Sequence, residues 1–342
     1  MEDIGNYIFN FENEVANLRH ALDGAADDIT FAEVDIMPPE GLIGPTKVEI
    51  LHIAGDSIPE ANNSSRVRAD IVLQYNKEQG RGSYAGAVLS ASGESLPYIS
   101  LRKDEPFTDA FDESNKSLMR LFGLYHETAH IFISGPIADK DHSFCECAAD
   151  AYAALRFFQR FGQEAESTLS MISWLRSFKA LHKSDTAHLT TTVLDKIIDD
   201  SASMDFSALK PDETVILAAK YALEWTPPPD VLAAARKVFP SAGSINLKQI
   251  SETCLTSPND LAFYIGAKLF QPYLRPEGVI HDDEAVQLPD EVRLKLAALI
   301  EERAEKLTLS FDSAAKHSQK TPVSKLLKVS RPKGQKHTVV KI

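Results

Sequence analysis

The segment HETAH, residues 126–130, carries side chains whose types and spacing suit metal chemistry. Histidines four residues apart lie on one face of a helix, about one turn from each other, so His126 and His130 can bind a single Zn²⁺. The glutamate between them, Glu127, can then act as a general base toward water. The segment lies in an apolar run, residues 121–133, which favours a buried helix over a surface helix with an incidental histidine pair.

A catalytic zinc site needs a third protein ligand and an open fourth position. Glu146 follows His130 by sixteen residues and is followed one turn later by Asp150, so both acids lie on one face of a second helix. We expect Glu146 to complete the ligand set and Asp150 to accept the free ring N–H of a ligand histidine. Two alternatives remain: Asp150 could replace Glu146 as the ligand, or His142 in the connecting loop could bind the metal.

The combination of these residues resembles the gluzincin metallopeptidases, and the resemblance covers about 30 residues around the two helices. It implies that His126, His130 and Glu146 bind zinc, that Glu127 is the catalytic base and that Asp150 supports a histidine ligand. The linker between the two helices is shorter than in the large gluzincins, which implies a compact form of that fold.

The metzincin pattern does not fit the same segment. That pattern has a glycine three residues after the second histidine and a histidine or aspartate three residues further on. Ile133 and Pro136 occupy those two positions in this chain. The expected site therefore takes its third ligand from the second helix.

These residues predict a zinc-dependent peptidase acting on a peptide or protein. Zinc lowers the pKa of water and polarises a carbonyl group, while Glu127 moves a proton from water to the leaving amine. One alternative is a catalytically inactive zincin-fold protein with a binding or regulatory role; another is a structural zinc, which usually takes four protein ligands. A further donor must stabilise the oxyanion, and the downstream candidates are Tyr152, His182, His188, Tyr221 and Tyr264.

The chain is expected to adopt an α+β fold, in which a zincin-like domain with a mixed β-sheet and an active-site helix precedes a mostly helical region. Apolar residues spaced by three and four predict an amphipathic helix over residues 2–24. The chain is expected to divide into four segments: an N-terminal amphipathic helix 1–28, a zincin-like catalytic core 29–162, a helical region 163–312 that completes the cleft, covers it or recognises substrate, and a basic, disordered tail 313–342.

Short apolar runs between turn residues predict five strands in the first third of the chain. The run nearest the active-site helix, Pro97–Arg102, is the candidate for a sheet edge that pairs with extended substrate, although an internal strand is an equal alternative. The five strands are expected at Thr30–Ile36, Lys47–Ile53, Asp70–Gln74, Tyr84–Ser90 and Pro97–Leu101.

Helical periodicity dominates the chain from about Ser114 onward. The active-site helix is expected to begin near Ser114 or Asn115 and to end at Gly135-Pro136, and the second helix to run from Phe144 to Phe161. Later helices are expected in Ala165–Leu181, Leu194–Ile198, Thr214–Trp225, Val231–Phe239, Leu261–Phe270 and Val292–Leu307.

Composition limits the other classes of function. The 342 residues carry a net charge of −13, and no apolar run is long enough to span a membrane. The acidic body argues against nucleic acid as the substrate. The N-terminus lacks a signal-peptide pattern and the chain has three cysteines, so the prediction is a cytoplasmic protein or an effector delivered into another cell. The tail 313–342 has eight basic and no acidic residues, which suits an acidic partner or a secretion signal.

Overall fold

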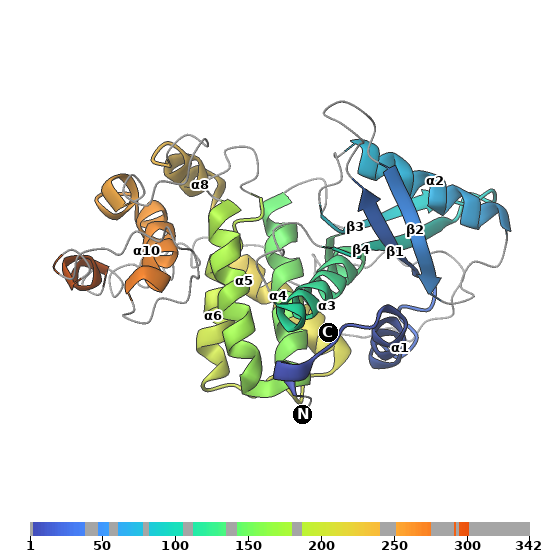
Figure 1. Cartoon of the computed structure of the whole chain (residues 1–342), viewed down its shortest axis with the longest axis horizontal. Coiled ribbons are helices and arrows are strands. Elements are labelled where there is room, and N and C mark those ends of the chain that lie inside the picture. The colour runs from blue at the N-terminus through green and yellow to red at the C-terminus, as the bar shows by residue number, and fades with distance from the viewer. Residues whose placement is uncertain are drawn as a thin grey trace.

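The computed structural model describes residues 3–37, 47–54, 61–77, 82–104, 112–134, 142–179, 187–239, 251–274, 291 and 294–300. A four-stranded mixed sheet and a larger set of helices make up these residues, which confirms the expected α+β class. The sheet lies at one side of the molecule, the helices α3 (Glu113–Ala129) and α4 (His142–Phe161) in the middle and the last helices at the other side (Figure 1).

The sheet has the strand order β2-β1-β4-β3. β1 pairs in parallel with β4, and the two outer pairs are antiparallel. Four of the predicted strands are confirmed: β1 (Thr30–Met37), β2 (Lys47–Ala54), β3 (Tyr84–Leu89) and β4 (Ser95–Arg102). The prediction that Pro97–Arg102 forms a sheet edge is wrong, because β4 lies between β1 and β3. The edges of the described sheet are β2 and β3.

Both faces of the central strands are buried, and the side chains alternate between two cores. The larger core, called the main core here, lies between the sheet and the helices that follow it, and Phe31 of β1 faces it. Ala32 and Val34 of β1 face a smaller core on the opposite face of the sheet. In β4, Ile99 faces the main core and Tyr98 the other. On the side of the main core, β4 contacts the helix that contains the HETAH segment.

The second face is covered by α2 (Ala61–Lys77), which lies over the sheet in Figure 1. The predicted strand Asp70–Gln74 is therefore wrong. Val67, Ile71 and Tyr75 are spaced by four residues and are all buried, so one helical stripe packs on the sheet. The Tyr75 hydroxyl donates to the carbonyl of Ser100 at 3.4 Å, fixing this stripe over β4.

The N-terminal helix is shorter than predicted. A 3₁₀ turn, η1 (Ile4–Asn6), precedes α1 (Phe11–Ala21), and Asn10 caps α1 by accepting from the backbone N–H of Asn13 at 3.0 Å. Ile8 fits the apolar spacing of the predicted helix, but it lies in the connection between η1 and α1 and is 67% exposed. The helix begins only after Asn10, because the Asn10 side chain satisfies a free N–H of the first turn. The apolar spacing in the sequence continues toward the N-terminus but does not extend the helix.

Helices α3 (Glu113–Ala129) and α4 (His142–Phe161) pack against each other and match the two helices predicted to carry the site. α4 is the central helix, since α3, α6 and α7 all pack on it. The remaining helices follow the predicted order: α5 (Ala165–Lys179), α6 (Thr191–Ser201), α7 (Pro211–Trp225), α8 (Pro229–Arg236) and α10 (Asp260–Leu274).

The later helices have a core of their own. Leu232 of α8 and Phe263 of α10 lie in an apolar cluster separate from the one that surrounds α4. Figure 1 shows α8 and α10 on the side of the molecule opposite the sheet. Among the described residues, no helix is both long and apolar enough to cross a membrane. The predicted tail, 313–342, lies outside the described residues.

Candidate metal centre

Helix α3 presents the HETAH segment from a buried position. Asp112 starts the helix by accepting from the backbone N–H of Asn115 at 2.8 Å, close to the predicted start. Thr128 is fully buried, and its hydroxyl donates to the carbonyl of Leu124 at 2.7 Å, so this hydroxyl needs no water. His130 opens a π-helical turn, η2 (His130–Ser134), a distortion frequently found at functional sites.

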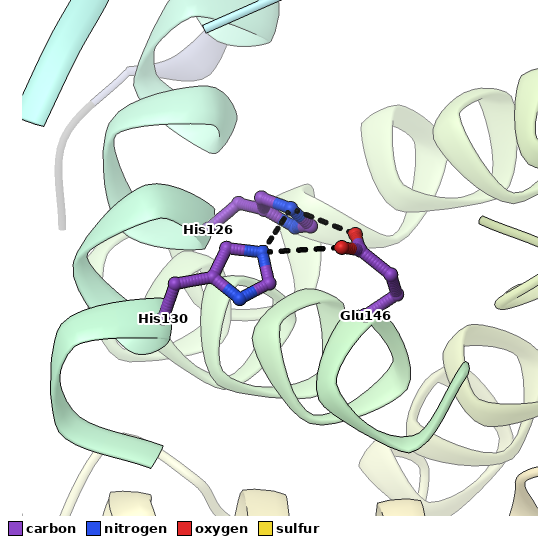
Figure 2. A group of neighbouring side chains, drawn as sticks. All are labelled: His126, His130 and Glu146. Atoms are coloured by element: carbon purple, nitrogen blue, oxygen red, sulfur yellow. Dashed lines mark hydrogen bonds and ion pairs between the residues drawn. The ribbon is translucent and has the colours of Figure 1, made fainter. Parts of the chain in front are cut away.

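His126, His130 and Glu146 converge between α3 and α4. Figure 2 shows both imidazoles projecting from one helix toward the carboxylate on the facing helix. One candidate ligand atom from each residue lies within 4.8 Å of the others. The two Nε2 atoms are 3.0 Å apart, His126 Nε2 lies 3.3 Å from Glu146 Oε2, and His130 Nε2 lies 3.5 Å from Glu146 Oε1.

These separations suit a metal ion held by the two nitrogens and the carboxylate of Glu146, whose two oxygens each face one histidine. Ligand atoms 2.0–2.1 Å from a tetrahedral Zn²⁺ are about 3.3 Å from one another, which is the range observed here. Glu146 Oε2 is buried and, among the described residues, accepts no hydrogen bond, although His126 and His188 lie within ion-pair distance of it. A buried carboxylate oxygen in that state is costly unless a cation compensates it.

Asp150 lies on the other side of the His126 ring. Its Oδ1 is 2.6 Å from His126 Nδ1, and the residue is fully buried. With an ionised Asp150, Nδ1 carries the proton in the neutral ring, so Nε2, which faces His130 and Glu146, is the nitrogen that can bind a metal ion. The alternative that Asp150 replaces Glu146 as a ligand does not suit this geometry, because the Asp150 carboxylate faces the ring nitrogen that points away from the cluster.

The electrostatics of the cluster favour a cation. Burial alone would lower the pKa of His126, but Asp150 and Glu146 outweigh it and raise that pKa to about 10. Burial would raise the pKa of Glu146, yet the neighbouring imidazoles of His126 and His130 hold it well below its usual value. Asp150 also has a pKa well below its usual value, since Arg176 and His126 overcome the effect of its burial. The carboxylates are thus ionised, and their field attracts positive charge.

Glu127 adjoins the cluster and is 8% exposed. Burial raises the pKa of its carboxyl group, while His126 and His130 act in the opposite direction and Glu146 adds to the rise. A buried carboxylate with a raised pKa is a stronger base than an exposed one. Its chemistry therefore suits proton transfer beside the predicted metal ligands.

His188 is the one described oxyanion candidate that lies at the cluster. Its Nε2 is 3.2 Å from Glu146 Oε2, whereas Tyr221 and Tyr264 donate their hydroxyls to Asp200 and Asp195. Tyr152 is fully buried in the core, where burial raises its pKa to about 12. His182 lies outside the described residues.

His142, the alternative metal ligand, sits at the rim of the cluster. Its Nδ1 is 3.5 Å from Glu146 Oε1, and its side chain is 69% exposed. Among the residues that the structure describes, it is not part of the group whose ligand atoms share a single centre. His142 is the first residue of α4, so the predicted place in the connecting loop is wrong, and its exposed position favours a histidine that faces solvent over a metal ligand.

Two residues of the site have no counterpart in the sequence predictions. Arg176 of α5 donates from Nε and Nη2 to the two oxygens of Asp150, each at 2.8 Å, and the hydroxyl of Thr190 donates to Oδ2 of the same carboxylate. Both lie more than 25 residues beyond Asp150, and no motif or spacing links them to it. Only the packing of α5 and α6 on α4 brings them together.

Comparisons with protein-family models, with curated proteins and with solved structures give no match for this chain. The function is therefore inferred from the donor set of α3 and α4: two imidazoles and a carboxylate around one point, with a buried glutamate next to them.

Proposed function

We propose that the protein is a zinc-dependent peptidase. The observation that carries the proposal is the convergence of His126, His130 and Glu146 beside the buried Glu127. A His₂Glu set with an open fourth position is a ligand set of catalytic zinc, whereas structural zinc usually takes four protein ligands, often cysteines. When bound, Zn²⁺ supplies Lewis acidity, lowering the pKa of water and polarising the substrate carbonyl.

Glu127 is the proposed base. It receives the proton from the attacking water and passes it to the nitrogen of the leaving amine, so that one carboxylate serves both halves of the reaction. Its burial supports this role, because a desolvated carboxylate accepts a proton more readily than an exposed one. An inactive protein with a binding role would have no need of a base at this position.

Edge strand β3 is the proposed contact for an extended substrate. It has a free edge in the described sheet and contacts the η2 turn that begins at His130. Backbone groups along such an edge can pair with a peptide of varied sequence. The proposed substrate class is accordingly a peptide or an extended segment of a protein.

His188 is proposed to stabilise the oxyanion. His188→Ala is expected to lower kcat about 10²–10³-fold with little change in metal content, since the donor acts on charge that develops in the transition state. The measurement is steady-state kinetics with metal analysis on the same preparation. His142→Ala is the matched control, because His142 lies at a similar distance from Glu146 but is exposed. An equal loss in both variants would contradict the assignment.

Glu146→Ala is expected to reduce zinc affinity by more than the ~10–100-fold that loss of an outer-sphere partner costs, because it removes a direct ligand. Competition with a chromophoric chelator measures the affinity. His142→Ala again serves as the control and should bind zinc as the wild type does. Full affinity in Glu146→Ala together with a loss in His142→Ala would assign the third ligand to His142.

Two experiments test the function as a whole. Metal analysis of purified protein is expected to find about one zinc per chain, and protein without zinc or another transition metal would remove the proposal. Comparison of new protein N-termini in cells expressing wild type or Glu127→Gln should reveal cleavage sites present only with wild type. Identical N-termini in the two samples would favour the alternative of a non-catalytic zincin-fold protein.

A further inference from the structure

We propose that Arg176 and Thr190 are positioning residues of the metal centre, which fix Asp150 and through it the His126 imidazole. The inference rests on the proposed metal site and assigns part of its affinity to the α5–α6 helix pair. It makes the helical region after residue 163 a component of the metal centre, not only a cover for the cleft or a recognition module.

The carboxylate of Asp150 is hydrogen-bonded by side chains from three parts of the fold. This carboxylate is fully buried and is held from three elements: His126 on α3, Arg176 on α5 and Thr190 ahead of α6. The guanidinium meets both carboxylate oxygens, each at 2.8 Å, so it fixes the plane of the carboxylate as well as its position. The carboxylate plane in turn sets the direction from which Oδ1 accepts the His126 Nδ1 proton.

Arg176 also supplies positive charge to a cluster rich in carboxylates. Three buried carboxylates, Glu127, Glu146 and Asp150, lie within or next to the cluster. A divalent cation offsets two of these charges, and the guanidinium of Arg176 offsets the third. Without Arg176, Asp150 would lose the two-point contact that fixes its plane and would be a buried charge without its cation, which is costly. The hydrogen bond that orients the His126 ring would then lose its fixed acceptor.

Side-chain hydrogen bonds also join α5 to α6. Ser173, nearly one turn before Arg176, donates to Asp195 of α6 at 2.6 Å, and the hydroxyls of Ser177 and Thr191 are 3.0 Å apart. Ser177 and Thr191 are the direct neighbours of Arg176 and Thr190 in the sequence. The two donors to Asp150 are therefore held in place before any metal binds, which limits the entropy lost on binding.

The expected consequence is a loss of metal affinity when either donor is removed. Arg176→Met should lower zinc affinity about 10–100-fold, as for other outer-sphere partners of histidine ligands. Thr190→Val keeps the shape of the side chain and removes one hydrogen bond, so a smaller loss is expected. Arg176→Lys should fall between wild type and Arg176→Met, because an ammonium restores the charge but not the two-point contact.

The test measures zinc affinity by chelator competition and the electronic spectrum of the Co²⁺-loaded protein, with circular dichroism to verify folding. Lys196→Met is the matched control: Lys196 on α6 pairs with Asp200 at 2.7 Å and lies over the ring of Trp225, so its partners are neither Asp150 nor the Ser173–Asp195 contact. It should keep wild-type affinity and spectrum. A loss in Lys196→Met equal to that in Arg176→Met would overturn the inference, since it would indicate general destabilisation.

A double-mutant cycle separates positioning from packing. In an Asp150→Asn background, Arg176→Met should cause little further loss of zinc affinity, because the two residues act through one contact. Additive losses would overturn the inference. If Arg176→Met does not fold, Thr190→Val in the same cycle decides the question.

The outcomes also distinguish this inference from the proposed function. Wild-type protein that binds no metal would remove the proposed site itself. Tight zinc binding by wild type that is unchanged in both Arg176→Met and Thr190→Val would overturn only the positioning role. Zinc binding that falls in these variants, in a protein without peptidase activity, would support the positioning role and remove the proposed reaction.

Discussion

Replacing Glu127 by glutamine is expected to slow peptide hydrolysis about 10²–10⁴-fold, the usual contribution of a positioned general base. Glutamine matches glutamate in shape but cannot take the proton from water. The three proposed ligands His126, His130 and Glu146 are left in place, so zinc affinity should remain close to that of the wild type. The pair of measurements is kcat on a cleaved peptide and zinc content by metal analysis.

The zinc content of Glu127→Gln decides how a loss of activity is interpreted. A loss of both zinc and activity would show that the substitution disturbs the buried site, and Glu127→Asp would then be the better test, since it keeps the charge and shortens the reach. Unchanged cleavage with full zinc content would contradict the assignment of Glu127 as the base. Removing zinc with a chelator and restoring it should reverse the activity of wild type only.

The sequence predicts those parts of the site that local helix geometry determines. The four-residue spacing of His126 and His130 and that of Glu146 and Asp150 each determine a shared helix face, and the structure brings these faces together. The place of His188 could not be obtained in this way. It lies more than 40 residues from Glu146 and was one of five candidates, since a contact between distant segments leaves no periodic signal.

Two errors in the predicted fold concern the segment Asp70–Gln74 and the place of β4 in the sheet. The run Ile71-Val72-Leu73 suggested a strand because β-branched residues favour strands, yet Val67, Ile71 and Tyr75 form the buried stripe of α2. A longer window would have found that spacing. The interior place of β4, in contrast, depends on its parallel pairing with β1 across more than 60 residues. The local pattern of Pro97–Arg102 carries no information about this partner.

The second large effect concerns the stability of the helix that carries Glu146 and Asp150. Arg160, near the end of α4, donates from both terminal nitrogens to the two oxygens of Glu14 on α1. Glu14 is 4% exposed, and the guanidinium of Arg160 also lies over the ring of Tyr7, 5.0 Å from its centroid. Because one partner of a buried pair cannot be removed without leaving the other charge uncompensated, Arg160→Met is expected to lower the free energy of unfolding by about 3–5 kcal/mol.

Urea denaturation of the metal-free protein measures this loss, with an unchanged slope indicating that the folded state is still compact. Lys116→Met is the control, because the exposed Lys116–Glu113 pair, at 3.0 Å, should contribute only about 0–1 kcal/mol. The double variant Glu14→Leu/Arg160→Met should recover part of the stability, since two apolar side chains can replace a buried ion pair. A cost below about 1 kcal/mol for Arg160→Met alone would mean that Glu14 gains water or a proton when Arg160 is lost, and that α1 is not anchored to α4 by this pair.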